Sequence, residues 1–191
     1  MNKYLIIGLG NIGMEYAHTR HNIGFDVVTA FVIKHGGMFA SNRLADVAEI
    51  KIKGRTFICI KPSTFMNLSG KAFKYWIEKT KIEIQNTLTI LDDLALPLNK
   101  LRLKEVGSDG GHNGLKDIQL TLGTTNYPKL RFGIGNDYPK GMQSDFVLGK
   151  WNSTELPSVK KKIEKAVEII EKFAFEGIEK TMNEVNKLTF E

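Results

Sequence analysis

Three short loops of this sequence carry asparagine and histidine side chains among small residues, each after a strand-like apolar run. The loops span residues 8–24, 65–70 and 111–114, and their polar candidates are Asn11, His21, Asn67, His112 and Asn113. An imidazole titrates near neutral pH, so it can take a proton from water and return it during hydrolysis. Asparagine amides can orient a peptide group or bind an oxyanion without adding charge. Taken singly, each asparagine is also typical of a turn.

A catalytic imidazole needs a partner that fixes its tautomer and stabilises its charged form, which a carboxylate at a strand end can supply. Asp92 fits this description because it follows the apolar run 88–91. Two alternatives stay open: Asp92 as a loop cap, and His21 as a residue in the first turn of a helix. The sequence has no nucleophile-elbow serine and no cluster at metal-ligand spacing. Hydrolysis here would therefore use activated water, and we expect no bound metal.

The glycine pattern G-x-G-x-x-G at residues 8–13 also matches the fingerprint of dinucleotide-binding folds. That fingerprint needs an apolar helix that begins within the loop and an acidic residue about 20 positions later, at the end of a second strand. Here residues 14–21 are mostly polar, Asp26 falls within a predicted helix, and Asp46 begins a strand. The sequence thus argues against a dinucleotide site, and we expect no cofactor.

Strand-like and helix-like segments alternate along the chain, which predicts an α/β domain whose polar loops gather at one edge of the sheet. Strands are predicted at 4–9, 45–53, 55–61, 87–91, 98–103, 130–134 and 144–148, with 45–53 and 55–61 forming a hairpin. Helices are predicted at 21–35, 69–79 with Ser69 as cap, 114–122, 154–175 and 178–186. We expect one three-layer domain over residues 1–191, with a twisted mixed β-sheet flanked by helices. The C-terminal helices are amphipathic, with the lysines at 160–162 on the outer, solvated side or in a ligand site.

Composition sets bounds on the class of protein. The 191 residues are 25% charged and 42% hydrophobic, an ordinary globular balance. Lys plus Arg exceed Asp plus Glu by 27 to 21, and the net charge of +6 fits either a polyanionic partner or a solvated basic surface. The single cysteine, Cys59, excludes a disulfide framework and is expected to be buried in a strand. Without a signal peptide or an apolar run near the roughly 20 residues of a membrane span, we expect a cytoplasmic protein with no membrane partner.

Several motifs together resemble those of bacterial-type peptidyl-tRNA hydrolases. They are Gly-Leu-Gly-Asn-x-Gly at 8–13 with Tyr16, Thr-Arg-His-Asn-x-Gly at 19–24, Lys-Pro-x-Thr-Phe-Met-Asn-Leu-Ser-Gly at 61–70, Asp-Asp-Leu at 92–94 and Gly-Gly-His-Asn-Gly-Leu-Lys at 110–116. The motifs stand in the family's order, and the resemblance runs from Lys3 to the C-terminal helices.

The resemblance implies an enzyme that hydrolyses the ester between a peptide, or another N-blocked aminoacyl group, and the 3′ end of tRNA. Such an enzyme returns free tRNA to translation, needs no metal or cofactor, and is monomeric. His21 would be the general base that activates water, with Asp92 as its orienting carboxylate. Asn113 would help to place the water or the developing oxyanion.

The resemblance also assigns binding roles. Asn11 and Asn67 match positions that hold the peptidyl part and the reacting ester. Tyr16, Met66 and His112 would line the cleft. Lys104 and Arg131 would clamp the 5′-phosphate of the acceptor stem of the tRNA, with Arg102 nearby.

Two stretches depart from the family pattern. Ala95 stands where the family usually carries a further Asp, and residues 136–141, with Lys140, replace a common Arg-Pro. The alternative function is an RNA-binding relative that keeps the fold without catalysis. The intact set of His21, Asp92 and the three asparagines favours the enzyme, because a pure binder has no chemical need of all five.

Overall fold

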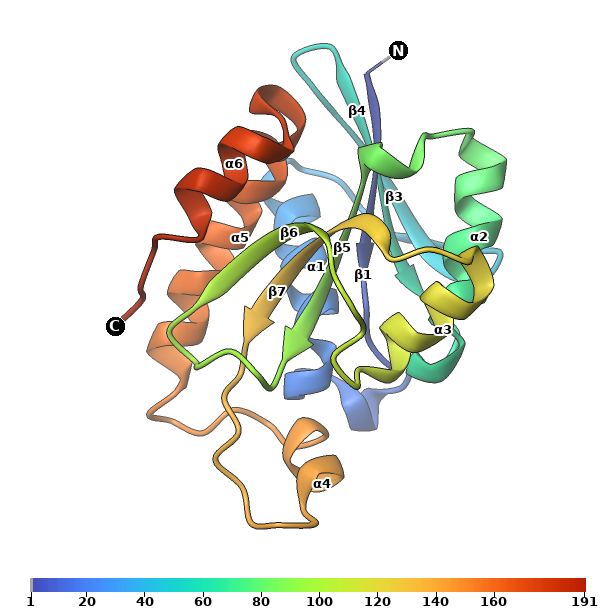
Figure 1. The fold of residues 1–191 in the computed structure, drawn as a ribbon. Helices are drawn as coiled ribbons and strands as arrows, with labels where there is room; N and C mark the ends of the chain where they lie inside the picture. Colours follow the sequence, from blue (N-terminus) through green and yellow to red (C-terminus); the bar gives the residue numbers. More distant parts are fainter. Residues whose placement is uncertain (1) are drawn as a thin grey trace.

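The chain folds around one mixed sheet, seen in a computed structural model that describes residues 2–191. Over those residues the seven strands run in the order β2-β3-β4-β1-β5-β7-β6 (Figure 1). Their bounds are β1 Lys3–Gly8, β2 Ala40–Asn42, β3 Ala45–Ile52, β4 Arg55–Pro62, β5 Thr87–Asp93, β6 Leu101–Val106 and β7 Asn126–Gly133. The expected α/β class with a mixed sheet is confirmed.

The four central strands β4, β1, β5 and β7 are parallel, whereas β2, β3 and β6 pair antiparallel. The predicted hairpin is confirmed as β3 and β4, which turn at Lys53 and Gly54 with positive φ angles of 47° and 81°. Strand β1 pairs with β4 on one side and β5 on the other. From β1 the chain passes to β4, on one side of β1, and from β4 it later passes to β5, on the other side. A topological switch point therefore lies between the carboxyl ends of β1 and β5. Open α/β sheets bind ligands at such points.

Helices cover both faces of the sheet. Their bounds are α1 Ile23–Lys34, α2 Ser69–Thr80, α3 Asn113–Leu122, α4 Gln143–Val147, α5 Leu156–Glu176 and α6 Ile178–Val185. In Figure 1, α1, α5 and α6 lie on one side of the sheet and α2 and α3 on the other. This confirms the three layers, with α4 standing apart from them beyond the carboxyl ends of β5 and β7.

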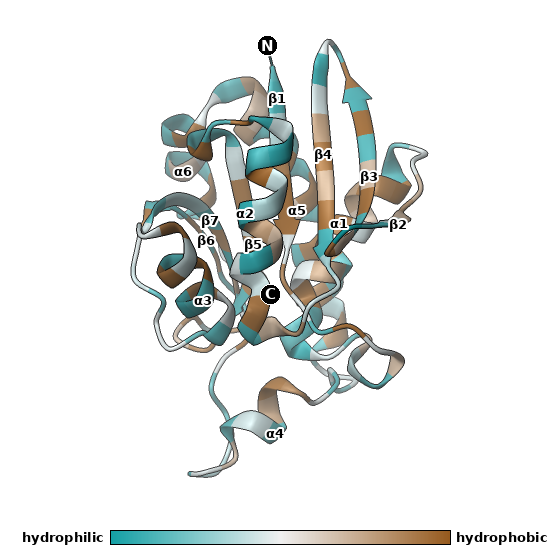
Figure 2. Cartoon of the chain, turned by 90° about the vertical axis from the view of Figure 1, so that its right-hand side faces the viewer, coloured by the Kyte–Doolittle hydropathy of each residue, from teal (hydrophilic) through white to brown (hydrophobic). Residues whose placement is uncertain are grey.

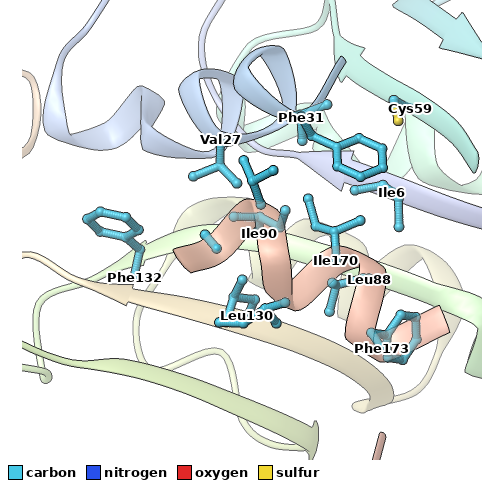
Figure 3. Close-up of a cluster of buried hydrophobic side chains, with 14 of the residues drawn as sticks. Ile6, Val27, Phe31, Cys59, Leu88, Ile90, Leu130, Phe132, Ile170 and Phe173 are labelled. Atoms are coloured by element: carbon cyan, nitrogen blue, oxygen red, sulfur yellow. The ribbon is translucent and has the colours of Figure 1, made fainter. Parts of the chain in front are cut away.

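Two hydrophobic cores fill the layers. Figure 3 shows the larger one, where Phe31 of α1 and Ile170 of α5 face sheet residues such as Ile6 and Leu130. The smaller core joins the opposite sheet face to α2 and α3 through Leu5, Phe73, Tyr127 and neighbouring residues. Successive residues of β1 serve opposite cores, which explains its continuous apolar run. Cys59 is buried as expected.

Several local predictions were wrong. Strand β7 begins at Asn126, four residues earlier than predicted. Residues 144–147 belong to helix α4 and not to a strand, and Leu148 ends that helix; local bonds such as Leu148 N–H to Ser144 O hold the turn. Strand β6 begins at Leu101, three residues later than predicted. Ser69 is the first residue of α2 and not its cap, since its hydroxyl donates to Met66 O at 2.7 Å.

Lys162 of α5 corrects a further prediction. It is fully buried, whereas the sequence places residues 160–162 on the outer side of the helix. Its ammonium group donates to Leu98 O and Gly133 O, both at 2.6 Å, and lies 3.9 Å from the centre of the Phe132 ring. These three partners replace the water that a lysine loses on burial. Burial lowers the pKa of Lys162 to about 7.

The low pKa of Lys162 makes stability depend on pH. Between pH 7 and its ordinary pKa of 10.5 the folded protein binds fewer protons at Lys162 than the unfolded chain does. The free energy of unfolding therefore rises with pH in this range, by a few kcal/mol at most. We expect Lys162→Met to lose this slope. Urea denaturation from pH 6.5 to 9.5 should then show that the free energy of unfolding of the wild type, relative to that of the variant, increases with pH. A difference in free energy of unfolding that stays constant over that range would contradict the prediction.

Among residues 2–191, none of the helices combines the length and the apolar character that crossing a bilayer requires.

Candidate active site

His21 lies at the switch point because of two glycines. It belongs to a single 3₁₀ turn, Arg20–Asn22, that leads directly into α1. A Cβ atom on Gly8 would lie 2.2 Å from Gly24 O, and a Cβ atom on Gly24 would lie 2.4 Å from Ile90 O. Only glycine permits this approach, so the start of α1 packs directly against the ends of β1 and β5. The glycines of the first two motifs thus bring helix and strand together and so position His21.

Asp92 meets His21 at the carboxyl end of β5. The two carboxylate oxygens Oδ1 and Oδ2 lie 3.0 and 2.9 Å from His21 Nδ1, and Asp92 is only 3% exposed. An ionised carboxylate can only accept hydrogen bonds, so His21 Nδ1 donates. The other ring nitrogen, Nε2, is then the one that can take a proton.

His112 contacts the same carboxylate from the other side. Its Nε2 lies 2.8 Å from Asp92 Oδ1, and its Nδ1 accepts the backbone N–H groups of Gly114 and Leu115 at the start of α3. A backbone N–H only donates, so Nδ1 carries no proton and Nε2–H donates to Asp92. The family resemblance implies that His112 lines the cleft, but the sequence does not indicate this contact. Its position beside the predicted start of a helix was the one available signal.

Asp92 therefore accepts hydrogen bonds from two imidazoles. Burial by itself raises the pKa of its carboxyl, but His112 and His21 outweigh burial through their charge and their hydrogen bonds. Together they hold the pKa of Asp92 well below its usual range. Asp92 is consequently an anion at any pH where a histidine is neutral, as a partner that stabilises an imidazolium must be.

The same three side chains are the candidate metal ligands. One ligand atom from each of His21, Asp92 and His112 lies within 4.8 Å of the others. His21 Nδ1 lies 2.9 Å from Asp92 Oδ2, and His112 Nε2 lies 2.8 Å from Asp92 Oδ1. These are distances of N–H···O hydrogen bonds, so the candidate ligand atoms are already bonded to one another. A divalent ion would have to displace both protons and the N–H contacts of α3 with the His112 ring.

A cavity of about 100 Å³ adjoins these groups. His21, Asp92, His112 and Asn113 line it together with Arg131 and, from α4, Gln143, Ser144 and Val147. The structure thus brings all three predicted catalytic residues to one cavity. The α4 residues were not anticipated.

Asn11 holds the first two loops together. Its side-chain Oδ1 accepts the Met66 N–H at 2.7 Å, while its backbone N–H and C=O both bond the amide of Asn22. Asn22 directly follows His21, so these bonds link Asn11 to the turn that carries His21. Asn11 lines a separate cavity of about 180 Å³ with Phe25, Lys61 and others. Asn22 is a further residue whose role the sequence did not reveal.

The second loop lies beside the third. Met66 is buried against Gly114, where an added Cβ would lie 2.8 Å from Met66 Sδ. Asn67 follows it on an exposed 3₁₀ turn, and Tyr16 packs edge-on against Phe65 with the ring centres 6.4 Å apart. The second loop thus contacts Tyr16 through Phe65 and Asn11 through Met66, while Asn67 is exposed on it.

The predicted tRNA-binding residues lie on one face of the β6–β7 pair. Arg102 is opposite Arg131, and Lys104 is opposite Lys129. Arg131 is only 8% exposed; it donates to Ser108 O at 2.6 Å and lies 3.6 Å from Asp93 Oδ2. Burial, and then the neighbouring Arg131, lower the pKa of Lys129 to about 8. Lys104 and Arg102 are the more accessible members of this basic group.

Known proteins match this chain over nearly its whole length, which includes all of the candidate site residues. The model of the peptidyl-tRNA hydrolase family matches residues 5–191. The peptidyl-tRNA hydrolase of Phocaeicola vulgatus is 52% identical over 185 residues, which cover 97% of this chain and 99% of that protein. That of Bacteroides fragilis is 53% identical over the same shares of both chains. A crystal structure of peptidyl-tRNA hydrolase from Acinetobacter baumannii matches with a TM-score of 0.92 at 33% identity, covering 98% of this chain and 96% of that one.

Proposed function

This chain belongs to the peptidyl-tRNA hydrolase family and is an ester hydrolase of that kind, and we propose from this premise how its residues act. His21 is the general base, and the observation that carries this assignment is its contact with Asp92. With Nδ1 donating to a buried anion, Nε2 takes a proton from a water molecule in the adjoining cavity.

The reaction follows from this geometry. The water oxygen bonds to the ester carbonyl carbon as its proton moves to His21 Nε2, giving a tetrahedral oxyanion. The bond from that carbon to the 3′-terminal ribose oxygen then breaks, and the imidazolium returns the proton to the ribose oxygen. The products are a peptide with a free carboxyl group and a tRNA with a free 3′ end. Asp92 stabilises the imidazolium between the two steps.

Asn113 lies in the same cavity at the start of α3, where an amide can donate to the oxyanion. Asn11 and Asn67 bind the peptidyl part; the Asn11 oxygen is already bonded to Met66, so its amide nitrogen is the donor for substrate. Tyr16 and Met66 supply apolar surface beside them. His112, whose ring nitrogens both bond within the protein, supports Asp92 as well as lining the cleft.

The acceptor stem of the tRNA binds along the basic face of β6 and β7, where Arg102, Lys104 and Arg131 meet phosphate. The protein acts as a monomer in the cytoplasm, without a cofactor. Of these side chains Lys104 is the exposed one, so it is the most direct test of phosphate binding.

We expect Lys104→Ala to raise KM for a tRNA substrate several-fold and to leave kcat unchanged, because Lys104 meets phosphate far from the reacting carbon. The slope of log KM against log salt should fall by about one unit. Lys51→Ala is the matched control, since it removes an equal charge from β3, in the other half of the sheet. Equal effects of the two substitutions would show that only net charge matters.

The experiment that tests the function is release of N-acetyl-aminoacyl groups from tRNA by the purified protein, with EDTA present. Rapid release supports water activation without a metal ion. Unblocked aminoacyl-tRNA is the comparison substrate, and it should be cleaved slowly because its charged amino group would have to lose its water. Binding of tRNA without release of either group would instead support the non-catalytic RNA-binding alternative.

A further inference from the structure

One wall of the active-site cavity comes from a short helix that reaches the body of the protein through few residues, with Phe146 and Val147 packed at the edge of the larger core. Helix α4 contributes Gln143, Ser144 and Val147 to the cavity, yet it has only five residues and stands away from both helical layers. Figure 2 shows it projecting from the rest of the molecule. Residues 141–145 are all exposed, so the wall depends on contacts made by the remainder of the segment.

Beside this core packing, the polar contacts of the segment converge on Arg20, the residue before His21. The Arg20 guanidinium lies 4.2 Å from the centre of the Phe146 ring on α4 and 5.3 Å from that of Trp151. Its Nη1 donates to Phe146 O at 3.1 Å, and its Nη2 donates to Glu155 Oε1 at 2.8 Å. One side chain thus contacts α4, the residues after it and the start of α5.

The backbone reinforces this junction. Arg20 N–H donates to Gly149 O at 3.0 Å, and Thr19 forms an antiparallel bridge with Lys150. A Cβ atom on Gly149 would lie 3.0 Å from Arg20 Nη1, so the two segments are in close contact. Arg20 is 8% exposed, and the ion pair with Glu155 is correspondingly shielded from water.

We propose that Arg20 is a positioning residue that fixes the α4 wall relative to His21. It touches neither the cavity nor the reacting atoms, but it joins the turn that carries His21 to the helix that faces it. The planar guanidinium suits this role because it can stack on rings and donate in two directions at once. The proposal rests on the proposed role of His21, because the position of the α4 wall relative to His21 affects turnover only if His21 acts in the reaction.

The test compares Arg20→Gln with Arg55→Gln. Arg55 is a matched control because it also donates to a carbonyl, Ala174 O at 3.2 Å, and stacks on an aromatic ring, Phe175 at 4.3 Å, away from the cavity. We expect Arg20→Gln to lower kcat by tenfold to a hundredfold with KM within about threefold, because small misplacement of a reacting group costs that much. Arg55→Gln should keep kcat within about twofold. Rates are compared per folded molecule, below the melting temperature of each variant.

Hydrogen exchange gives a readout that is independent of activity. Amides of residues 142–150 should exchange at least tenfold faster in Arg20→Gln, and at the wild-type rate in Arg55→Gln. Phe146→Leu, which keeps the Arg20–Glu155 pair, should lower kcat in the same direction. Unchanged exchange at 142–150, or equal kcat in the two arginine variants, would overturn the proposal. Should His21→Ala keep full activity, the proposed function fails while the exchange result still reports on Arg20.

Discussion

Replacing His21 by alanine is expected to lower kcat by about 10²- to 10⁴-fold while the affinity for tRNA stays within about twofold. General-base catalysis by a positioned side chain contributes roughly this much. His21 contributes no side-chain atom to the basic face of β6 and β7, so binding of the acceptor stem should persist. Single-turnover release of N-acetyl-aminoacyl groups measures the chemical step, and a filter-binding titration with deacylated tRNA measures affinity.

The chain offers a matched control for this substitution. His18 Nδ1 lies 3.1 Å from Asp26 Oδ1, so it forms a second histidine–aspartate pair only three residues away, with a His18 side chain 78% exposed. His18→Ala should keep kcat within about twofold. If His21→Ala loses tRNA affinity along with turnover, His21 is structural and its assignment as the base is wrong.

Asp92→Asn is expected to have a comparable effect, with kcat lower by about 10²- to 10⁴-fold and KM little changed. The carboxylate accepts from His21 and from His112, whereas an amide offers one accepting oxygen and places an NH₂ group against a second donor. One imidazole must then change its tautomer or rotate, and the imidazolium formed during catalysis loses its anionic partner. Single-turnover release measured over a range of pH would quantify the loss.

A second measurement separates this catalytic loss from unfolding. Because the pKa of Asp92 is lowered in the folded state, its contribution to stability is present above the ordinary carboxyl pKa and disappears only as pH falls through the lowered value. Asp92→Asn should therefore melt at a lower temperature than the wild type at pH 7. Asp26→Asn, which alters the exposed pair with His18, should leave kcat unchanged. Wild-type turnover in folded Asp92→Asn would contradict the mechanism.

Local patterns in the sequence determined most of the elements. The apolar run that became β1, the turn at Lys53–Gly54 and the spacing in α5 each report on neighbours a few residues away, which is the range over which periodicity carries information. Motif order indicated the family, and the comparisons confirm it. The grouping of polar loops at one sheet edge also followed, because the carboxyl ends of parallel strands meet there.

Only the tertiary structure decided which side chains touch. His112 donates directly to Asp92, although β6 lies between them along the chain, and Asn22 bonds to Asn11 across a loop. Lys162 is buried because Leu98 O, Gly133 O and the Phe132 ring surround it, although none of them is near it in the sequence. Helix α4 likewise contacts Arg20, which is 126 positions away from Phe146. Charge and polarity alone predict exposure, so a buried polar group can be recognised only when its distant partners are known.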